Sequence, residues 1–265
     1  MESESVAEPS TREIVLEQED MQMIQAYLRS GNPSHFLQIA QIRYQLAMLR
    51  AGRMAKGNAH VMEKFDSAVI AKTVEHNMEQ LHRGAAIGRC DLLINVLRSI
   101  ERVYEYNETN QILCVGPRTE SEILGLIGAG FQMKNIRALD LISYSPLVDL
   151  GDMHAMPYPE KSFDVIILGW VIGYSKDCAR VAKEVRRVAK RGAVVAIGCE
   201  YQPRTNEELK AKGGLLEGDH TAFSESQQYL ELFEGNIEQV YFRHDPLPHK
   251  KGKAVGHVMA IFQLK

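Results

Sequence analysis

Apolar positions along the chain follow two different periods, and the change between them divides the sequence. From residue 13 to about residue 106, apolar residues recur every three to four positions, as they do in helices that bury one face. From residue 111 onward, short apolar runs alternate with helical stretches, which is typical of a parallel sheet covered by helices. We therefore predict a helical segment over residues 13–106 and an α/β domain over residues 107–265, after an acidic, disordered tail at residues 1–12.

The helical segment is predicted to contain several helices. Asn32-Pro33-Ser34 and Gly57-Asn58 interrupt the apolar pattern, and two further stripes run from Val61 to Leu81 and from Leu92 to Ile100. Apolar stripes of this kind are usually packing faces. We expect them to cover the active site of the α/β domain, to form a homodimer interface, or both.

The α/β domain is predicted to begin and end with clearly separated strands. The predicted strands include the apolar runs at residues 112–115, 136–141, 165–168, 237–242 and 257–264. The first three suit a parallel sheet, and the last two suit an antiparallel hairpin that closes it. A helix is expected over residues 224–233, just before this hairpin.

The end of the first strand carries a pattern that suits an anionic ligand. Gly116 ends the strand, and Thr119-Glu120-Ser121-Glu122 has the spacing of a capping box, in which Thr119 accepts from the amide of Glu122. We therefore predict a helix that starts at the carboxyl end of the strand. Its free amides and the positive end of its dipole would face the ligand.

Composition and charge exclude several classes of function. A formal net charge of -3 gives no electrostatic footprint for nucleic acid or for an anionic membrane. The amino-terminal residues lack the regions of a signal peptide, and no apolar run is long enough for a membrane span, so we expect a cytoplasmic protein. The four cysteines and nine histidines show no metal-ligand spacing. No G-x-G-x-x-G follows Val115, which argues against a dinucleotide-dependent oxidoreductase.

The most specific pattern lies between Asp152 and Gly192. Its residues are Asp152, Met156, Pro157, Tyr158, Ser162, Phe163 and Asp164, followed by Glu184, Arg187, Val188, Lys190 and Gly192. This order resembles the class I methyltransferases that depend on S-adenosylmethionine (SAM), in the group with the pattern D-x-x-x-L-P-F-x-x-x-S-F-D and a helix that ends E-h-x-R-V-L-K-P-G-G. The resemblance spans roughly residues 111–201 and implies a Rossmann-like, mostly parallel sheet.

The resemblance implies SAM as the cofactor and a set of residues around it. Asp140 would bind the ribose hydroxyls, Asp152 would accept from the adenine amino group, and Met153 would cover the adenine ring. The remaining cofactor-binding candidates are Gly116, Arg118, Gly169 and Trp170.

The chain departs from the family pattern at two places. Where the family has G-x-G-x-G, this sequence has Gly116-Pro-Arg-Thr-Glu120, so either Arg118 binds the carboxylate of SAM directly or SAM binding is lost. The connection from Asp140 to Asp152 is too short for a crossover helix, so we predict a loop through residues 143–146 that leaves one wall of the cleft open.

The predicted function is transfer of a methyl group from SAM to a small molecule or glycan intermediate, with oxygen favoured as the acceptor atom. A general base must lie within hydrogen-bond reach of the acceptor. The catalytic candidates are His154, Tyr174 and His220. Two alternatives remain open: a non-catalytic scaffold that keeps the fold but has lost the cofactor, and a methyltransferase that acts on a protein.

Overall fold

The computed structural model describes residues 17–31, 33–58, 60–62, 90–117, 119–175, 177–205, 207–208 and 222–265. The predicted tail at residues 1–12 and the candidates Arg118 and His220 lie outside the described residues. Most of the helix expected over residues 61–81 does so as well.

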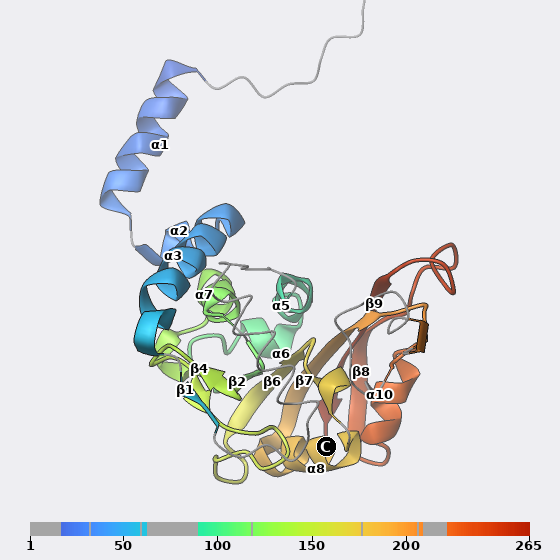
Figure 1. Ribbon diagram of the computed structural model, residues 1–265. Coiled ribbons are helices and arrows are strands. Elements are labelled where there is room, and N and C mark those ends of the chain that lie inside the picture. Colours follow the sequence, from blue (N-terminus) through green and yellow to red (C-terminus); the bar gives the residue numbers. More distant parts are fainter. Residues whose placement is uncertain are drawn as a thin grey trace, which may run out of the picture.

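Among the described residues, seven strands form one sheet in the order β5-β3-β2-β6-β7-β9-β8 (Figure 1). The strands are β2 (Ile112–Val115), β3 (Ile136–Asp140), β5 (Asp149–Leu150), β6 (Phe163–Gly169), β7 (Ala189–Tyr201), β8 (Ile237–His244) and β9 (Gly256–Leu264). The first five in the sheet order are parallel, whereas β9 pairs antiparallel with both β7 and β8. The predicted Rossmann-like sheet with an antiparallel carboxyl-terminal hairpin is confirmed.

Helices cover both faces of the sheet, which explains why the central strands are apolar throughout. On one face lie α5 (Asp91–Leu97), α6 (Glu101–Tyr104) and α7 (Ser121–Gly128), and on the other lie α8 (Cys178–Val188) and α10 (Gln227–Leu232). In β2, Ile112 and Cys114 pack under the first group, while Leu113 and Val115 pack under the second. This alternation follows from the two-residue period of a strand.

The amino-terminal part is helical, as predicted. It contains α1 (Gln18–Ser30), α2 (Pro33–Phe36) and α3 (Ala40–Asn58). Helix α3 packs on α7 through Ala47 and Leu124, whereas α1 stands away from the body of the molecule (Figure 1). An ion pair of 2.6 Å between Arg43 and Asp91 ties α3 to α5. None of the helices in the described ranges is long and apolar enough to span a membrane.

The connection between β3 and β5 is a loop without a helix, as its length predicts. It contains the two-residue strand β4 (Ile142–Ser143), which pairs antiparallel with β1 (His60–Val61). Val61 was expected to begin a helix, so that detail of the prediction is wrong. The strand forms because the short loop leaves an unpaired edge that a segment far away in the sequence can join.

Candidate functional site

The sequence candidates that the structure describes gather at one edge of the sheet. Because β2, β3, β5 and β6 are parallel, their carboxyl ends meet there, and ligands of open α/β sheets bind at this edge. Gly116, Asp140, the loop after Leu150 and the Gly169-Trp170 pair all follow these strand ends.

The turn after β2 packs closely against the segment after β6. Gly116 has φ +72, and a Cβ atom at this position would lie 2.5 Å from Cγ2 of Val171. Only glycine avoids both the backbone strain and this contact. Gly116 therefore holds two strand ends together at the edge of the candidate site.

The helix after this turn starts differently from the prediction. Thr119 accepts from the amide of Ser121 at 3.3 Å, and the expected capping box with Glu122 does not form. The amide of Glu120 donates to the hydroxyl of Tyr144 at 2.9 Å. These two amides are thus bound by the protein's own side chains, and the prediction that they face a ligand is wrong.

The side chain of Glu120 points into the protein at the start of α7 and is bound there by other residues. Its side chain is 0% exposed, and its carboxylate accepts from Nε and Nη2 of Arg50 in α3 and from the hydroxyl of Ser145. An ionised carboxylate can be buried only with such partners. Glu120 aligns with the last glycine of the family pattern G-x-G-x-G. In this protein it is therefore bound by Arg50 of the amino-terminal helical segment.

Asp140, the acid predicted for the ribose, lies at the end of β3 and is partly exposed. Its Oδ1 accepts from the amide of Ile142 at 3.1 Å, so it also shapes the loop that replaces the crossover helix. A cavity of about 670 Å³ lies beside this loop, lined by His60, residues 143–146 and residues 148–150. The expectation that the short connection leaves one wall of the cofactor cleft open stays a prediction.

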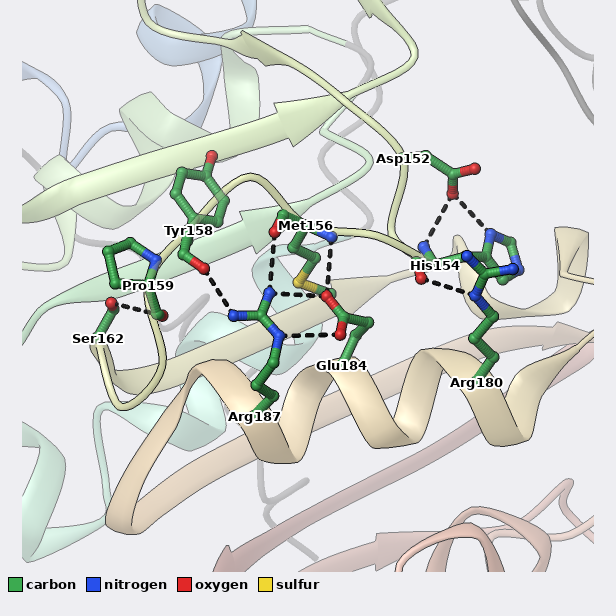
Figure 2. A network of polar contacts seen from close by, with 9 residues as sticks. All are labelled: Asp152, His154, Met156, Tyr158, Pro159, Ser162, Arg180, Glu184 and Arg187. Atoms are coloured by element: carbon green, nitrogen blue, oxygen red, sulfur yellow. Dashed lines mark hydrogen bonds and ion pairs between the residues drawn. The ribbon is translucent and has the colours of Figure 1, made fainter.

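Asp152 is fixed by His154 and remains able to bind a ligand. Its Oδ1 accepts from the amide of His154 at 2.8 Å and lies 2.6 Å from Nδ1 of the ring (Figure 2). Burial opposes ionisation of Asp152, but the hydrogen bonds from the side chain and backbone of His154 outweigh it and lower the pKa of the carboxyl group. Among the described residues, these bonds reach Oδ1 and none reaches Oδ2.

His154 links two loops of the site. Its Nε2 lies 2.7 Å from the hydroxyl of Ser175, and its carbonyl accepts from Nε of Arg180 at 2.9 Å. The order Asp152-His154-Ser175 has the connectivity of a hydrolase triad. However, Ser175 is fully buried and its hydroxyl also accepts from the amide of Asp177, so it cannot attack a substrate. The geometry suits a residue that positions Asp152.

Helix α8 braces the loop that carries Asp152. Arg187 donates to the carbonyls of Met156 and Tyr158 at 2.9 and 2.7 Å and forms an ion pair of 2.7 Å with Glu184 (Figure 2). Glu184 in turn accepts from the amide of Met156 at 2.9 Å. The charged residues of the motif that carried the resemblance therefore hold the loop in place.

Trp170 is one of two described residues other than glycine with a positive φ angle, at +59. Its amide donates to the carbonyl of Gly198 at 2.7 Å, and its ring is 5% exposed. A bulky residue in this backbone conformation is strained, and such strain is found mainly at functional sites. Tyr174 follows in the short helix η2 (Ile172–Tyr174) and is partly exposed.

Two residues that the sequence reasoning missed lie at the end of the sheet where β7 ends and β9 begins. The ring of His257 makes an edge-to-face contact with Trp170, with 5.5 Å between centroids. Nδ1 of His257 and Oε1 of Gln202 are buried and have no hydrogen-bond partner in the described part of the chain. The antiparallel register of β7 and β9 brings them to the same end of the sheet, because Tyr201 is opposite Gly256. No local sequence pattern predicts these two residues, because their proximity depends on the pairing of β7 with β9.

The surroundings of His257, burial above all, favour its neutral form. Burial lowers the pKa of its imidazole, the charge of Glu200 raises it, and the positive charges of His244 and Lys250 lower it further. The net shift is downward, so the ring has a free lone pair near neutral pH.

The site has the composition of an organic cofactor site. No group of three or more His, Cys, Asp and Glu side chains that could hold a metal ion occurs among the residues described. The donors suit adenosine instead, because Asp152 offers an unused carboxylate oxygen and Met153 packs beside it on the core as an apolar cover.

Comparison with known proteins agrees with this architecture. The model of a family described as "Methyltransferase domain" matches residues 132–197. A search of curated proteins finds no match.

Solved structures show a similar fold. One is a chain from the complex that contains the Trm112 methyltransferase activator of Haloferax volcanii, with 12% identity, a TM-score of 0.50, and coverage of 74% of this chain and 95% of that one. Another is the N-methyltransferase NodS from Bradyrhizobium japonicum WM9 in complex with S-adenosyl-L-homocysteine, with 12% identity, a TM-score of 0.49, and coverage of 75% and 99%. At 12% identity and a TM-score of 0.50, the likeness to the first of these chains concerns the fold alone. The family match to residues 132–197, together with the sheet order, supports a class I methyltransferase with SAM as its cofactor.

Proposed function

We propose that this methyltransferase acts on a hydroxyl oxygen of a small molecule or glycan intermediate. The observation that carries the proposal is the neutral, unpartnered Nδ1 of His257 beside the strained Trp170 at the cofactor edge of the sheet. An alcohol or phenol must lose its proton during methylation, and a neutral imidazole can accept it.

The adenosine end of the cofactor is assigned to the braced loop after β5. The free Oδ2 of Asp152 would accept from the adenine amino group, Met153 would cover the ring, and Asp140 would bind the ribose. Gly116, Arg118 and Gly169 are assigned to the amino-acid end of the cofactor. When bound, SAM supplies a methyl group that its sulfonium centre activates for transfer.

The acceptor is assigned to the neighbouring end of β7 and β9. Nδ1 of His257 accepts the proton of the attacking hydroxyl, and Oε1 of Gln202 accepts a second hydrogen bond from the same molecule. Both atoms would otherwise remain buried without a partner, which is unfavourable by about 1 to 3 kcal/mol for each. A bound acceptor with two donor groups removes this penalty.

Of the three residues proposed as catalytic from the sequence, His154 receives a different role. Both of its ring nitrogens are engaged by Asp152 and Ser175, so we assign it to positioning the adenine loop. Tyr174 and His220 stay candidates for contact with the acceptor.

Calorimetric titration with SAM and with S-adenosylhomocysteine tests the cofactor half. Asp152→Ala removes a charge-assisted hydrogen bond and should weaken binding at least tenfold, and Asp140→Ala should act in the same direction. Asp20→Ala, on the distant helix α1, is the control and should leave binding unchanged. If the intact, folded protein binds neither compound, the proposal fails.

The acceptor half is tested by a screen of hydroxylated small molecules with methyl-labelled SAM. His257→Gln should lower kcat at least tenfold while SAM binding persists, whereas His249→Gln, at an exposed position, should leave both unchanged. Equal kcat values for the two variants would remove His257 from the reaction.

A further inference from the structure

A strongly basic pocket lies at the opposite edge of the sheet from the methyltransferase site. It is a cavity of about 480 Å³ where β6 and β7 begin and β9 ends, beside the end of α8. The C-terminus lies close to α8 there (Figure 1). Six basic residues line the pocket together with one acid, Glu160; they are Lys161, Arg186, Arg187, Lys190, Arg191 and Lys265. Because the whole chain has a net charge of -3, composition alone does not produce this concentration.

Two of the six charges are neutralised inside the protein. Arg187 pairs with Glu184 at 2.7 Å, and Lys190 pairs with Asp164 at 2.6 Å. These ion pairs fix two residues that line the pocket. Because each cation is paired, Arg187 and Lys190 contribute little net charge for a ligand.

The other four cations have no carboxylate partner among the described residues. Arg186 donates to the carbonyl of Leu232 at 3.1 Å, and Lys265 donates to the carbonyl of Gly235 at 2.9 Å. Both partners are neutral, so the positive charges persist. Lys161 and Arg191 are exposed at the same pocket. Like charges that line one pocket repel one another, and an anion between them relieves the repulsion.

The backbone of Lys161 points to a role for its side chain. Lys161 is the second described residue other than glycine with a positive φ angle, at +53, and its amide donates to the carbonyl of Arg187 at 2.9 Å. Glycine or asparagine would fit this conformation with less strain. A lysine at a strained position of a basic pocket suggests that the charge is needed there.

We propose that this pocket binds the phosphate group of a phosphorylated small molecule. Phosphate carries up to two negative charges and accepts several hydrogen bonds, which matches a pocket with both guanidinium and ammonium donors. The cavity is within the usual size range of small-molecule sites, so it holds more than a bare ion. The pocket is separate from the methyltransferase edge, and the inference does not depend on the proposed acceptor.

Calorimetric titration of the full chain with pyrophosphate and with glucose 6-phosphate tests the proposal, with glucose as the uncharged control. Lys161→Gln combined with Arg191→Gln should weaken binding of both phosphates at least tenfold. The matched control is Lys134→Gln combined with Lys183→Gln, which removes the same charge from exposed positions outside the pocket. SAM binding should be the same in all of these proteins, which verifies that they are folded.

Lys161→Gly separates a functional role from a structural one. Glycine relieves the backbone strain, so the midpoint of thermal unfolding should rise, while affinity for pyrophosphate should fall. Three results would overturn the proposal: no binding of either phosphate, equal binding by the pocket and control variants, or sulfate binding as tight as that of pyrophosphate.

Discussion

Two loops at the same edge of the sheet are held in opposite ways. The loop after β5 is braced from outside, because Glu184 and Arg187 of α8 bind its backbone and leave Oδ2 of Asp152 available. The turn after β2 is closed from within, because Glu120 folds inward and Tyr144 takes its amide. Neighbouring residues hold the backbone of the loop after β5, so its side chains can bind a ligand. The side chains of the turn after β2 are buried in the protein and must be bound by other residues of the chain.

The largest expected effect concerns the closed turn. Arg50→Ala leaves the fully buried carboxylate of Glu120 without its cation, and loss of one partner of such a pair lowers the free energy of unfolding by about 3 kcal/mol. Urea denaturation measures this change. Arg53→Ala, at an exposed position of the same helix, is the control. A loss below about 1 kcal/mol, as for a surface ion pair, would show that the turn does not depend on α3.

Arg187→Ala, which affects the braced loop, should lower the free energy of unfolding by about 2 kcal/mol. The reason is that hydrogen bonds to two backbone carbonyls and the ion pair with Glu184 are lost together. SAM affinity should fall as well, since Asp152 is then less well positioned. Arg187→Lys should not restore either quantity, because an ammonium group cannot replace the planar fork of donors. Full rescue by lysine in urea denaturation and calorimetry would show that charge alone is sufficient.

Gly116→Ala should lower the free energy of unfolding by about 1 to 3 kcal/mol through backbone strain and the contact with Val171. Combining it with Val171→Ala should restore part of the loss, because the steric contribution disappears and the strain remains. Urea denaturation of the two single variants and the double variant measures the coupling. Simple additivity of the two losses would contradict a direct contact.

The smallest effect is a dependence of stability on pH. The pKa of Asp152 is lowered in the folded protein, so the unfolded chain binds its proton more readily as pH falls. The stabilisation from Asp152 is therefore present above the ordinary carboxyl pKa of about 4 and is lost as pH falls through the lower, folded value. Asp152→Asn should reduce the loss of unfolding free energy between pH 5 and pH 3 by an amount on the order of 1 kcal/mol or less. An unchanged profile would mean that His154 does not favour the ionised form.

Much of the sheet could be predicted because its signals are local. Buried apolar runs mark β2, β3 and β6 to within two residues, and the length of the chain from Asp140 to Asp152 already excludes a crossover helix. The family motif identifies the braced loop for the same reason, since its charged residues bind backbone within one short stretch of sequence.

The remaining features depend on contacts between distant residues. Arg50 and Glu120 are 70 positions apart, and no pattern near Glu120 shows that its side chain folds inward. The capping box does not form because the hydroxyl of Thr119 accepts from the amide of Ser121 instead of the amide of Glu122. His257 and Gln202 emerge only from the register of β7 and β9, and the basic pocket combines residues from separate parts of the chain.

Trp170 gives the protein a built-in optical reporter. It is the only tryptophan in the sequence, so all indole fluorescence originates at the carboxyl end of β6. A protonated imidazole in contact with an indole quenches its emission, and the ring of His257 lies against this one. Emission recorded during acidification therefore reads the charge of a single histidine without any label.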